Sequence, residues 1–299
     1  MIEVNDCTLL YPSKKGIANV SFSINQGEIF GYLGPNGAGK TTTIRAMMGF
    51  MKPQEGKILI RGYDAWEQSS QVQKYVGYLP GEIAFFDEMS GMDFLKFQAE
   101  LRGLKDLSLM YQLIKRFELD PKSKIRKMSK GMKQKIGLIC AFMHDPDVYV
   151  LDEPTSGLDP LMQQVFVDLV LEKKREGKTI LMSSHSFEEV EKTCDRIAMI
   201  KEGLIAVVED ITVIKKQRRK VFVVTVANES YAQTLVKMFP DAIDLGHFAF
   251  EVAVIGDFRK FFDSLKTMDI IDLDVKTQRI EEIFMQYYGR ENHHESNTI

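Results

Sequence analysis

A glycine-rich segment that ends in Lys40 and Thr41 has the composition of a phosphate-binding loop. It follows the apolar run 29–33, which predicts a buried strand, and it precedes a helical pattern over 41–50. Glycines here allow a backbone curl whose N–H groups converge on phosphate oxygens, beside the partial positive charge of a helix N-terminus. A chance glycine-rich turn is the alternative, and the flanking strand and helix disfavour it. The segment is Gly34-Pro35-Asn36-Gly37-Ala38-Gly39-Lys40-Thr41, which matches GxxxxGK[ST].

The side chains of this loop predict that the ligands are ATP and Mg²⁺. Lys40 would reach the β- and γ-phosphates, and the hydroxyl oxygen of Thr41 would bind Mg²⁺. The residues expected to contact the nucleotide in this segment are Gly34, Asn36, Gly37, Ala38, Gly39, Lys40, Thr41 and Thr42.

Two adjacent acids, Asp152 and Glu153, follow a second apolar run at 148–151. The carboxyl end of a strand is where an α/β sheet presents groups to its ligand. Asp152 would hold Mg²⁺, directly or from outside its inner coordination sphere, and Glu153 would polarise the attacking water as a general base. Alone, such a pair would be an ordinary surface turn. The pair also follows the glycine-rich loop with a helical segment between them. This combination is much rarer than an acidic pair alone and favours the catalytic interpretation.

A third group of motifs narrows the class of ATPase. Ser156-Gly157-Leu158-Asp159 and the lone His185, after a predicted strand at 179–183, have the order of the D-loop and switch histidine of ABC (ATP-binding cassette) nucleotide-binding domains. Tyr11, 29 residues before Lys40, matches the aromatic that stacks on adenine there, although a tyrosine at one position is more often a packing residue. Residues 1–210 resemble this family throughout. The segment that resembles its LSGGQ signature is Met128-Ser129-Lys130-Gly131-Met132-Lys133-Gln134.

The resemblance implies a mechanism in which two cassettes meet head to tail. Each ATP would lie between the P-loop of one chain and the signature loop of the other, where Ser129 and the Gly131 N–H would touch the γ-phosphate. His185 would contact the same phosphate from its own side, and Asp159 of the D-loop is counted with the nucleotide-binding residues. The dimer would be a homodimer, or a heterodimer with a second ABC ATPase.

The chain departs from the family pattern in two places. The signature has Lys130 where the family has Gly, and Met132 where it has Gln, while Gly131 is kept. After Leu79-Pro80 the family places a glutamine that touches Mg²⁺, and this chain has Gly81 followed by Glu82. Either Glu82 binds the metal through its carboxylate, or this contact is missing.

Strands that alternate with helices predict an α/β fold with a largely parallel sheet. The resemblance adds the fold class of a P-loop ABC ATPase core with antiparallel β and helical subdomains. The nucleotide-binding domain is expected over residues 1–215, with its helical subdomain at about 85–142, where helical periodicity covers 92–119 and 129–143.

A basic run at 215–220 predicts a linker to a second, smaller domain. Residues 220–290 are expected to form an accessory α/β domain of ferredoxin-like order. Its strands are predicted at 221–226, 248–254 and 270–275, and its helices at 231–239, 258–268 and 280–288. The polar residues 291–299 are expected to form a disordered tail.

Composition excludes several other classes of protein. The net charge of −3 gives no general attraction to nucleic acid, so no nucleic-acid partner is expected. The three cysteines lack CxxC spacing, which suits a reducing compartment and disfavours zinc. The sequence has neither a signal-peptide pattern nor an apolar run of membrane-spanning length. Any action at the cell membrane is therefore expected from its cytoplasmic face through a partner. The resemblance to ABC proteins implies that this partner is a separate multi-span permease.

Within the ABC families the sequence looks most like the ATPase subunits of bacterial exporters of antibiotics, lantibiotics, other peptides or lipids. The features that carry this resemblance are the form GYLPGE at 77–82, the SKGM signature at 129–132 and the extension that closes in Ile280-Glu281-Glu282-Ile283-Phe284. An importer ATPase would share every nucleotide motif and stays an alternative, as does a non-transport ABC ATPase.

Overall fold

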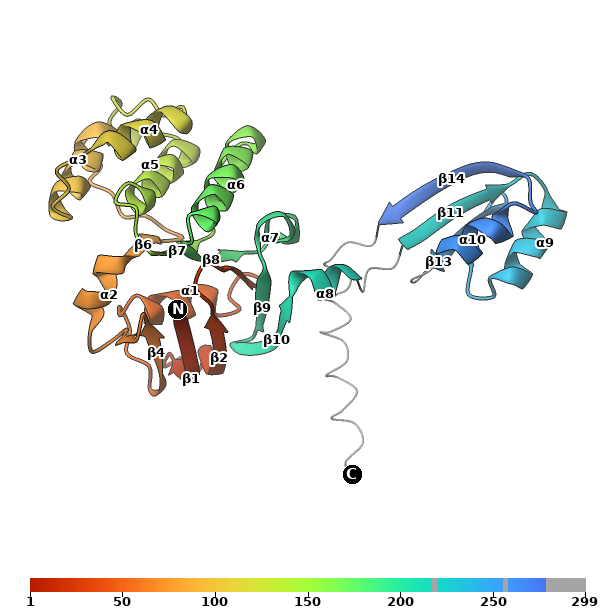
Figure 1. Ribbon diagram of the computed structural model, residues 1–299, viewed down its shortest axis with the longest axis horizontal. Helices are drawn as coiled ribbons and strands as arrows, with labels where there is room; N and C mark the ends of the chain where they lie inside the picture. The colour runs from red at the N-terminus through yellow and green to blue at the C-terminus, as the bar shows by residue number, and fades with distance from the viewer. Residues whose placement is uncertain (217–219, 255–257, 278–299) are drawn as a thin grey trace. The chain divides into compact units, whose positions relative to one another are not determined.

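The computed structural model describes residues 1–216, 220–254 and 258–277 (Figure 1). The chain divides into two compact units, the first over Met1–Ile211 and the second beginning at Thr212. Among the described helices, none has both the length and the apolar character that crossing a bilayer requires.

A six-stranded sheet forms the centre of the first unit, in the order β10-β9-β3-β8-β7-β6. The strands from β9 to β6 run parallel, and β10 adds an antiparallel edge. Every residue of β3, β7 and β8 is buried, as expected for continuous apolar strands of a parallel sheet that is covered on both faces. The strands are β3 (Ile29–Leu33), β6 (Val76–Leu79), β7 (Val148–Asp152), β8 (Thr179–Ser184), β9 (Arg196–Lys201) and β10 (Leu204–Asp210).

Helices connect the strands of this sheet, and three of them begin at or beside a predicted motif residue: α1 at Lys40, α5 at Ser129 and α6 at Asp159. Helix α1 ends at Met47, so the prediction of a helix to residue 50 was wrong. The reason is Gly49, which adopts φ 69° and packs so closely that a Cβ there would lie 2.3 Å from the Ala65 carbonyl oxygen. The helices are α1 (Lys40–Met47), α2 (Ser69–Tyr75), α5 (Lys130–Phe142), α6 (Pro160–Arg175) and α7 (Phe187–Thr193).

A second, antiparallel sheet in the first unit has the order β2-β1-β4-β5. Alternate side chains of β1, such as Ile2 and Val4, are buried in one apolar cluster with Ile44 of α1 and Tyr32 of β3. This packing joins the antiparallel sheet to the helix that begins at the phosphate-binding loop. The strands are β1 (Ile2–Leu10), β2 (Gly16–Ile24), β4 (Glu55–Ile60) and β5 (Tyr63–Asp64).

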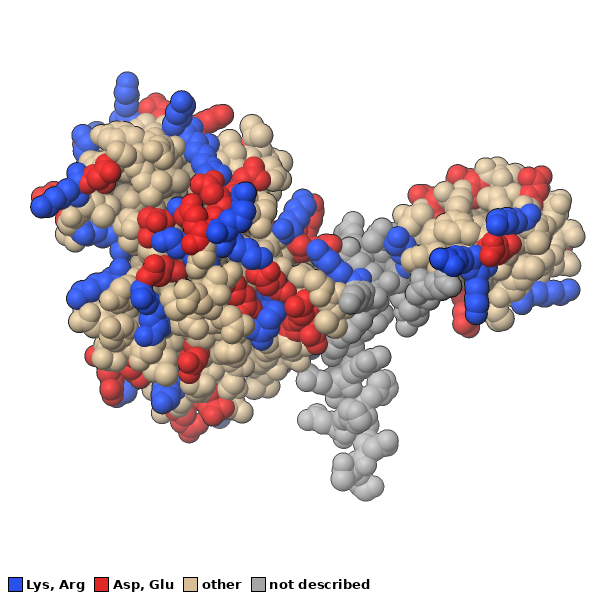
Figure 2. All heavy atoms as spheres, viewed as in Figure 1, with Lys and Arg blue, Asp and Glu red and all other residues tan. Residues whose placement is uncertain are grey.

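The helical segment between β6 and β7 contains α3 (Gly91–Leu101), α4 (Ser108–Arg116), the short 3₁₀ helix η1 (Ile125–Lys127) and α5. Edge-to-face and tilted contacts join Phe85 and Phe86 to Phe94. At its surface, Lys124 and Arg126 form ion pairs with Glu88. Figure 2 shows basic and acidic side chains interspersed over the visible face of this unit, without one dominant charge.

The second unit contains a four-stranded antiparallel sheet in the order β12-β13-β11-β14. From β11 to β14 the chain order is β-α-β-β-α-β, which is ferredoxin-like, whereas the elements predicted from sequence lacked the second of these four strands. Strand β12 was not predicted, because all four of its residues are exposed. The elements are α8 (Ile211–Lys216), β11 (Lys220–Val226), α9 (Glu229–Met238), β12 (Ile243–Gly246), β13 (Ala249–Val254), α10 (Phe258–Leu265) and β14 (Ile270–Thr277).

The core of the second unit lies between its sheet and its two long helices. Phe222 and Val224 of β11 pack there with Leu235 of α9 and Phe261 of α10. The predicted helix at 280–288 and the predicted tail at 291–299 lie outside the described residues.

Candidate functional site

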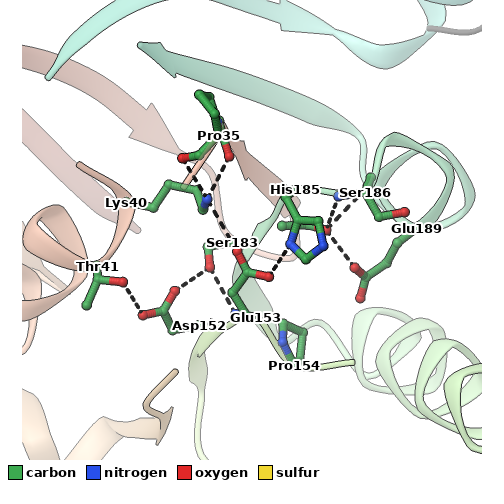
Figure 3. A network of polar contacts seen from close by, with 12 residues as sticks. Pro35, Lys40, Thr41, Asp152, Glu153, Pro154, Ser183, His185, Ser186 and Glu189 are labelled. Atoms are coloured by element: carbon green, nitrogen blue, oxygen red, sulfur yellow. Dashed lines mark hydrogen bonds and ion pairs between the residues drawn. The ribbon is translucent and has the colours of Figure 1, made fainter. Parts of the chain in front are cut away.

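Lys40 is the first residue of α1 and its ammonium group faces back into the loop that precedes it (Figure 3). Its side chain is 6% exposed, and Nζ donates to the carbonyl oxygens of Gly34 at 2.6 Å and Pro35 at 3.3 Å. The same nitrogen lies 3.3 Å from Oε1 of Glu153. A buried cation is therefore fixed at the N-terminus of a helix, next to a glycine-rich loop, and a helix N-terminus of this kind favours phosphate.

Two glycines of this loop are required by backbone geometry. Gly39 has φ 114°, in the left-handed region that other residues rarely adopt. A Cβ on Gly34 would lie 2.4 Å from the carbonyl oxygen of Ile200 in β9. The loop can thus curl against the sheet only with glycine at these positions.

Thr41 and Asp152 meet at the carboxyl end of the central strands. Thr41 Oγ1 donates to Asp152 Oδ2 at 2.8 Å, and Ser183 Oγ donates to Asp152 Oδ1 at 2.5 Å. Asp152 is fully buried at the end of β7 and is paired in register with Ser183 of β8. The hydroxyl and carboxylate oxygens together form the kind of hard ligand set that Mg²⁺ prefers.

Glu153 has an unusual backbone conformation, with φ 51° in the left-handed region. A residue other than glycine, asparagine or aspartate seldom adopts this conformation, and such strain concentrates at functional sites. The Glu153 N–H donates to Ser183 Oγ at 2.9 Å, and its Oε2 lies 2.5 Å from His185 Nδ1. The carboxylate is thereby held between Lys40 and His185 with 21% of its side chain exposed, accessible to a water molecule it could polarise.

His185 lies in a short turn between β8 and α7. Glu189 of α7 forms a hydrogen bond with this turn through Ser184. Ser184 Oγ donates to Glu189 Oε2 at 2.7 Å and accepts from the Ser186 N–H at 2.9 Å. Burial raises the pKa of Glu189 to about 7, and the nearby Glu153 carboxylate adds to this rise. A buried glutamic acid thus supports the turn that carries the histidine.

A cleft of about 670 Å³ opens over these residues. Gly34 and Ala38 are buried in the loop itself. Three other predicted residues, Ser129, Gly131 and Asp159, lie outside this lining; Ser129 is the N-cap of α5, and Asp159 is the N-cap of α6. The predicted site residues that line the cleft are Tyr11, Asn36, Gly37, Gly39, Lys40, Thr41, Thr42, Glu82, Asp152, Glu153 and His185.

The residues predicted for the adenine and the additional metal contact lie at the edges of this cleft. Tyr11 lines it, while its hydroxyl donates to the Met51 sulfur at 3.4 Å. A Cβ on Gly81 would lie 3.0 Å from Asp152 Oδ2, so a side chain there would require the carboxylate to shift by a few tenths of an ångström. Glu82 is exposed and lines the cleft, and no group of three metal-ligating side chains occurs among the described residues.

Sequence reasoning missed three residues that touch the site. Ser183 bonds to both Asp152 and Glu153, and its position at the end of a parallel neighbour strand is the signal that could have identified it. Lys130, noted only as a departure, lines the cleft while its aliphatic stem packs on Gly157. Gln134 donates to the backbone carbonyl oxygens that follow β7, which no sequence spacing indicates.

Comparison with known proteins agrees with this geometry. The ABC transporter family model matches residues 17–156. The ABC transporter ATP-binding protein NatA of Bacillus subtilis is 38% identical over 213 residues, which cover 68% of this chain and 87% of NatA. The bacitracin transport ATP-binding protein BcrA of Bacillus licheniformis is 31% identical over 250 residues, covering 82% of this chain and 81% of BcrA.

A solved structure of the ATP-binding subunit of an ABC transporter superposes with a TM-score of 0.67 at 31% identity, covering 73% of this chain and 92% of that one. Both sequence relatives are matched over most of their own length, and the solved structure shares the fold that positions Lys40, Asp152 and Glu153. The chain therefore belongs to the ABC transporter family, as one of its ATP-binding, ATP-hydrolysing subunits.

Proposed function

We propose that this chain powers an exporter of peptides, antibiotics or lipids by ATP-driven closure of a head-to-tail dimer. The observation that carries the export direction is the similarity to the bacitracin transport protein. That alignment covers 250 residues, more than the whole of Met1–Ile211, so it includes part of the second unit. An importer would share the nucleotide site, and the likeness beyond the cassette favours the exporter.

The site residues take the following roles in this proposal. Lys40 exchanges its bonds to the Gly34 and Pro35 carbonyl oxygens for the β- and γ-phosphates of ATP. Thr41 and Asp152, with Glu82 at the rim, would hold Mg²⁺, which neutralises charge on the phosphates. Glu153 polarises the attacking water, and His185 contacts the γ-phosphate from the same chain. Tyr11 stacks on the adenine.

A second cassette supplies the remaining contacts with the nucleotide. Ser129 is exposed and Gly131 lies beside it, and neither lines the cleft of its own chain. In a head-to-tail dimer they face the γ-phosphate held by the other chain, together with the D-loop residue Asp159. ATP then binds the closed dimer more tightly than the separate chains, which is the condition for a ligand to drive closure. A homodimer satisfies both sites, and a second ABC ATPase could replace one copy.

A groove of about 610 Å³ on the first unit suits a helix of the permease. Phe50 and Leu101 line it with 52% and 66% of their surfaces exposed, beside the cations Lys74 and Arg102. Burial lowers the pKa of His144, which also lines the groove, to about 4, so this ring is neutral near pH 7. An apolar helix with acidic residues at the cytoplasmic face of a membrane partner fits this lining.

The test is a pull-down of the tagged Glu153→Gln variant from detergent-solubilised native membranes with MgATP, followed by mass spectrometry. We expect a multi-span permease in the eluate, lost when Leu101→Glu is added to the same chain. Recovery of ribosomes or of soluble proteins alone would contradict the exporter proposal. Transport of the recovered permease's cargo in inverted vesicles then decides between export and import.

A further inference from the structure

Gln134 is a buried polar side chain of α5, the helix that begins at the signature segment. Its amide points at the residues that directly follow β7. Gln134 is 5% exposed on α5, five residues after Ser129. Its Nε2 donates to the Pro154 carbonyl oxygen at 2.9 Å and to the Glu153 carbonyl oxygen at 3.2 Å. A buried amide that donates to two backbone carbonyl oxygens restrains that backbone. Breaking these bonds would leave the amide or the carbonyl groups without a hydrogen-bond partner, which costs free energy.

The backbone that Gln134 touches is strained. Glu153 holds φ 51°, and its carbonyl oxygen also accepts from the Ser156 N–H at 3.1 Å. Strained conformations persist only where the surroundings determine them from several sides. Ser183 holds the Glu153 N–H, and Gln134 holds the carbonyl side.

A second contact joins the same two segments. A Cβ on Gly131 would lie 2.6 Å from the Gly157 carbonyl oxygen, and a Cβ on Gly157 would lie 3.0 Å from the stem of Lys130. The start of α5 is therefore packed at two points against the segment that follows Glu153. A displacement of the signature loop would move this segment as well.

We infer that Gln134 is a positioning residue that couples the signature loop to Glu153 of the same chain. This inference rests on the proposed head-to-tail dimer, in which that signature loop binds the ATP of the partner. Closure on one ATP then sets the backbone of the base that acts on the other ATP, and hydrolysis at each site depends on the occupancy of both.

The first test compares Gln134→Met, which keeps the volume and removes the donor, with the wild-type chain. We expect kcat to fall at least about tenfold, since small misplacement of a catalytic group is costly, while KM for ATP changes less than about twofold. A parallel loss of ATP binding, melting temperature and kcat would show a merely structural role and overturn the inference. If Gln134→Met does not fold, the same measurements are made on Gln134→Asn. This variant keeps the amide but shortens the side chain by one methylene, which moves the amide away from the Glu153 and Pro154 carbonyl oxygens.

The second test mixes variant chains, because it separates action within a chain from action across the dimer. In a mixed dimer with Glu153→Gln, the Gln134→Met chain keeps its own Glu153 and receives an intact signature loop from its partner. Our inference predicts no recovery of ATP hydrolysis in this mixture. Ser129→Arg mixed with Glu153→Gln is the matched comparison. There the only intact Glu153 belongs to the chain whose own signature loop is damaged, so our inference again predicts no recovery.

The outcomes are distinguishable. Recovery with Gln134→Met would place Gln134 at the partner's ATP and overturn the inference. Recovery with Ser129→Arg would show that Glu153 works without engagement of its own signature loop, and would overturn the inference too. A Glu153→Gln chain that binds MgATP but stays monomeric would instead overturn the head-to-tail dimer itself, and with it the proposed function.

Discussion

Glu153 Oε2 lies 2.5 Å from His185 Nδ1, although the two residues are 32 positions apart in the sequence. They follow the neighbouring parallel strands β7 and β8, so the sheet itself brings them together. The other oxygen of the same carboxylate lies 3.3 Å from Lys40 Nζ. One carboxylate thus contacts both Lys40 of the phosphate-binding loop and His185 of the turn after β8.

Replacing Glu153 with glutamine should abolish most ATP hydrolysis and keep ATP binding. The amide preserves shape but cannot accept a proton, and loss of a general base typically costs about a hundredfold to ten-thousandfold in kcat. Phosphate release under saturating MgATP measures the change. Glu172→Gln, which removes a surface partner of Arg116 in the same unit, is the control and should leave kcat unchanged.

Ser183→Ala should weaken both catalysis and folding. The hydroxyl donates to Oδ1 of buried Asp152 and accepts from the Glu153 N–H, so its removal takes this partner away from both groups, while Asp152 Oδ2 keeps its bond from Thr41. We expect the free energy of unfolding to fall by about 1–3 kcal/mol. Urea unfolding measures this quantity, and a variant with unchanged midpoint and unchanged kcat would show that the hydroxyl bridge has no role.

Glu189→Gln should change stability in a pH-dependent way. Burial raises the pKa of Glu189 from its ordinary 4.5 to about 7, so the folded state holds this proton more tightly than the unfolded state. Between these values the free energy of unfolding falls as pH rises, because the unfolded chain releases the proton first. The neutral glutamine avoids this loss, and the variant should gain up to about 3 kcal/mol over the wild type above pH 7.

The difference between variant and wild type should therefore be larger at pH 8 than at pH 5, as measured by urea unfolding. The adjacent Glu188 provides the control. A hydrogen bond from Lys192 lowers the pKa of this exposed carboxyl, so Glu188→Gln should not stabilise the protein at pH 8. Equal effects of Glu189→Gln on the free energy of unfolding at both pH values would contradict a Glu189 pKa that burial raises to about 7.

Glu82→Gln tests the replacement of the usual glutamine contact. If Glu82 at the cleft rim helps to hold Mg²⁺, its neutral form should raise the Mg²⁺ concentration that gives half-maximal hydrolysis several-fold. The kcat at saturating Mg²⁺ should stay close to that of the wild type, and EDTA should stop hydrolysis in both. An unchanged Mg²⁺ dependence would mean that this contact is missing from the chain.

The strands and loops that position Lys40, Asp152 and Glu153 were predictable from sequence, because each motif directly follows a wholly buried apolar strand. Parallel strands bring such ends to one edge of a sheet, and Ser183 could have been found by the same reasoning. The end of α1 was not predictable, since the close packing of Gly49 against Ala65 is a tertiary constraint.

Contacts between distant segments were also hidden from sequence. Gln134 lies on a helix whose apolar periodicity predicts burial, yet nothing in the spacing identifies the Pro154 carbonyl as its partner. The strand β12 has only four residues and all of them are exposed, including Ile243 and Leu245, so only its pairing with β13 defines it.

ATP-dependent dimerisation of the Glu153→Gln variant tests the central claim most directly. Light scattering after size-exclusion chromatography should show a dimer that contains two ATP molecules when MgATP is present, and a monomer with ADP. Adding Ser129→Arg to the same chain should restore the monomer. A Glu153→Gln chain that binds ATP but stays monomeric would contradict the account.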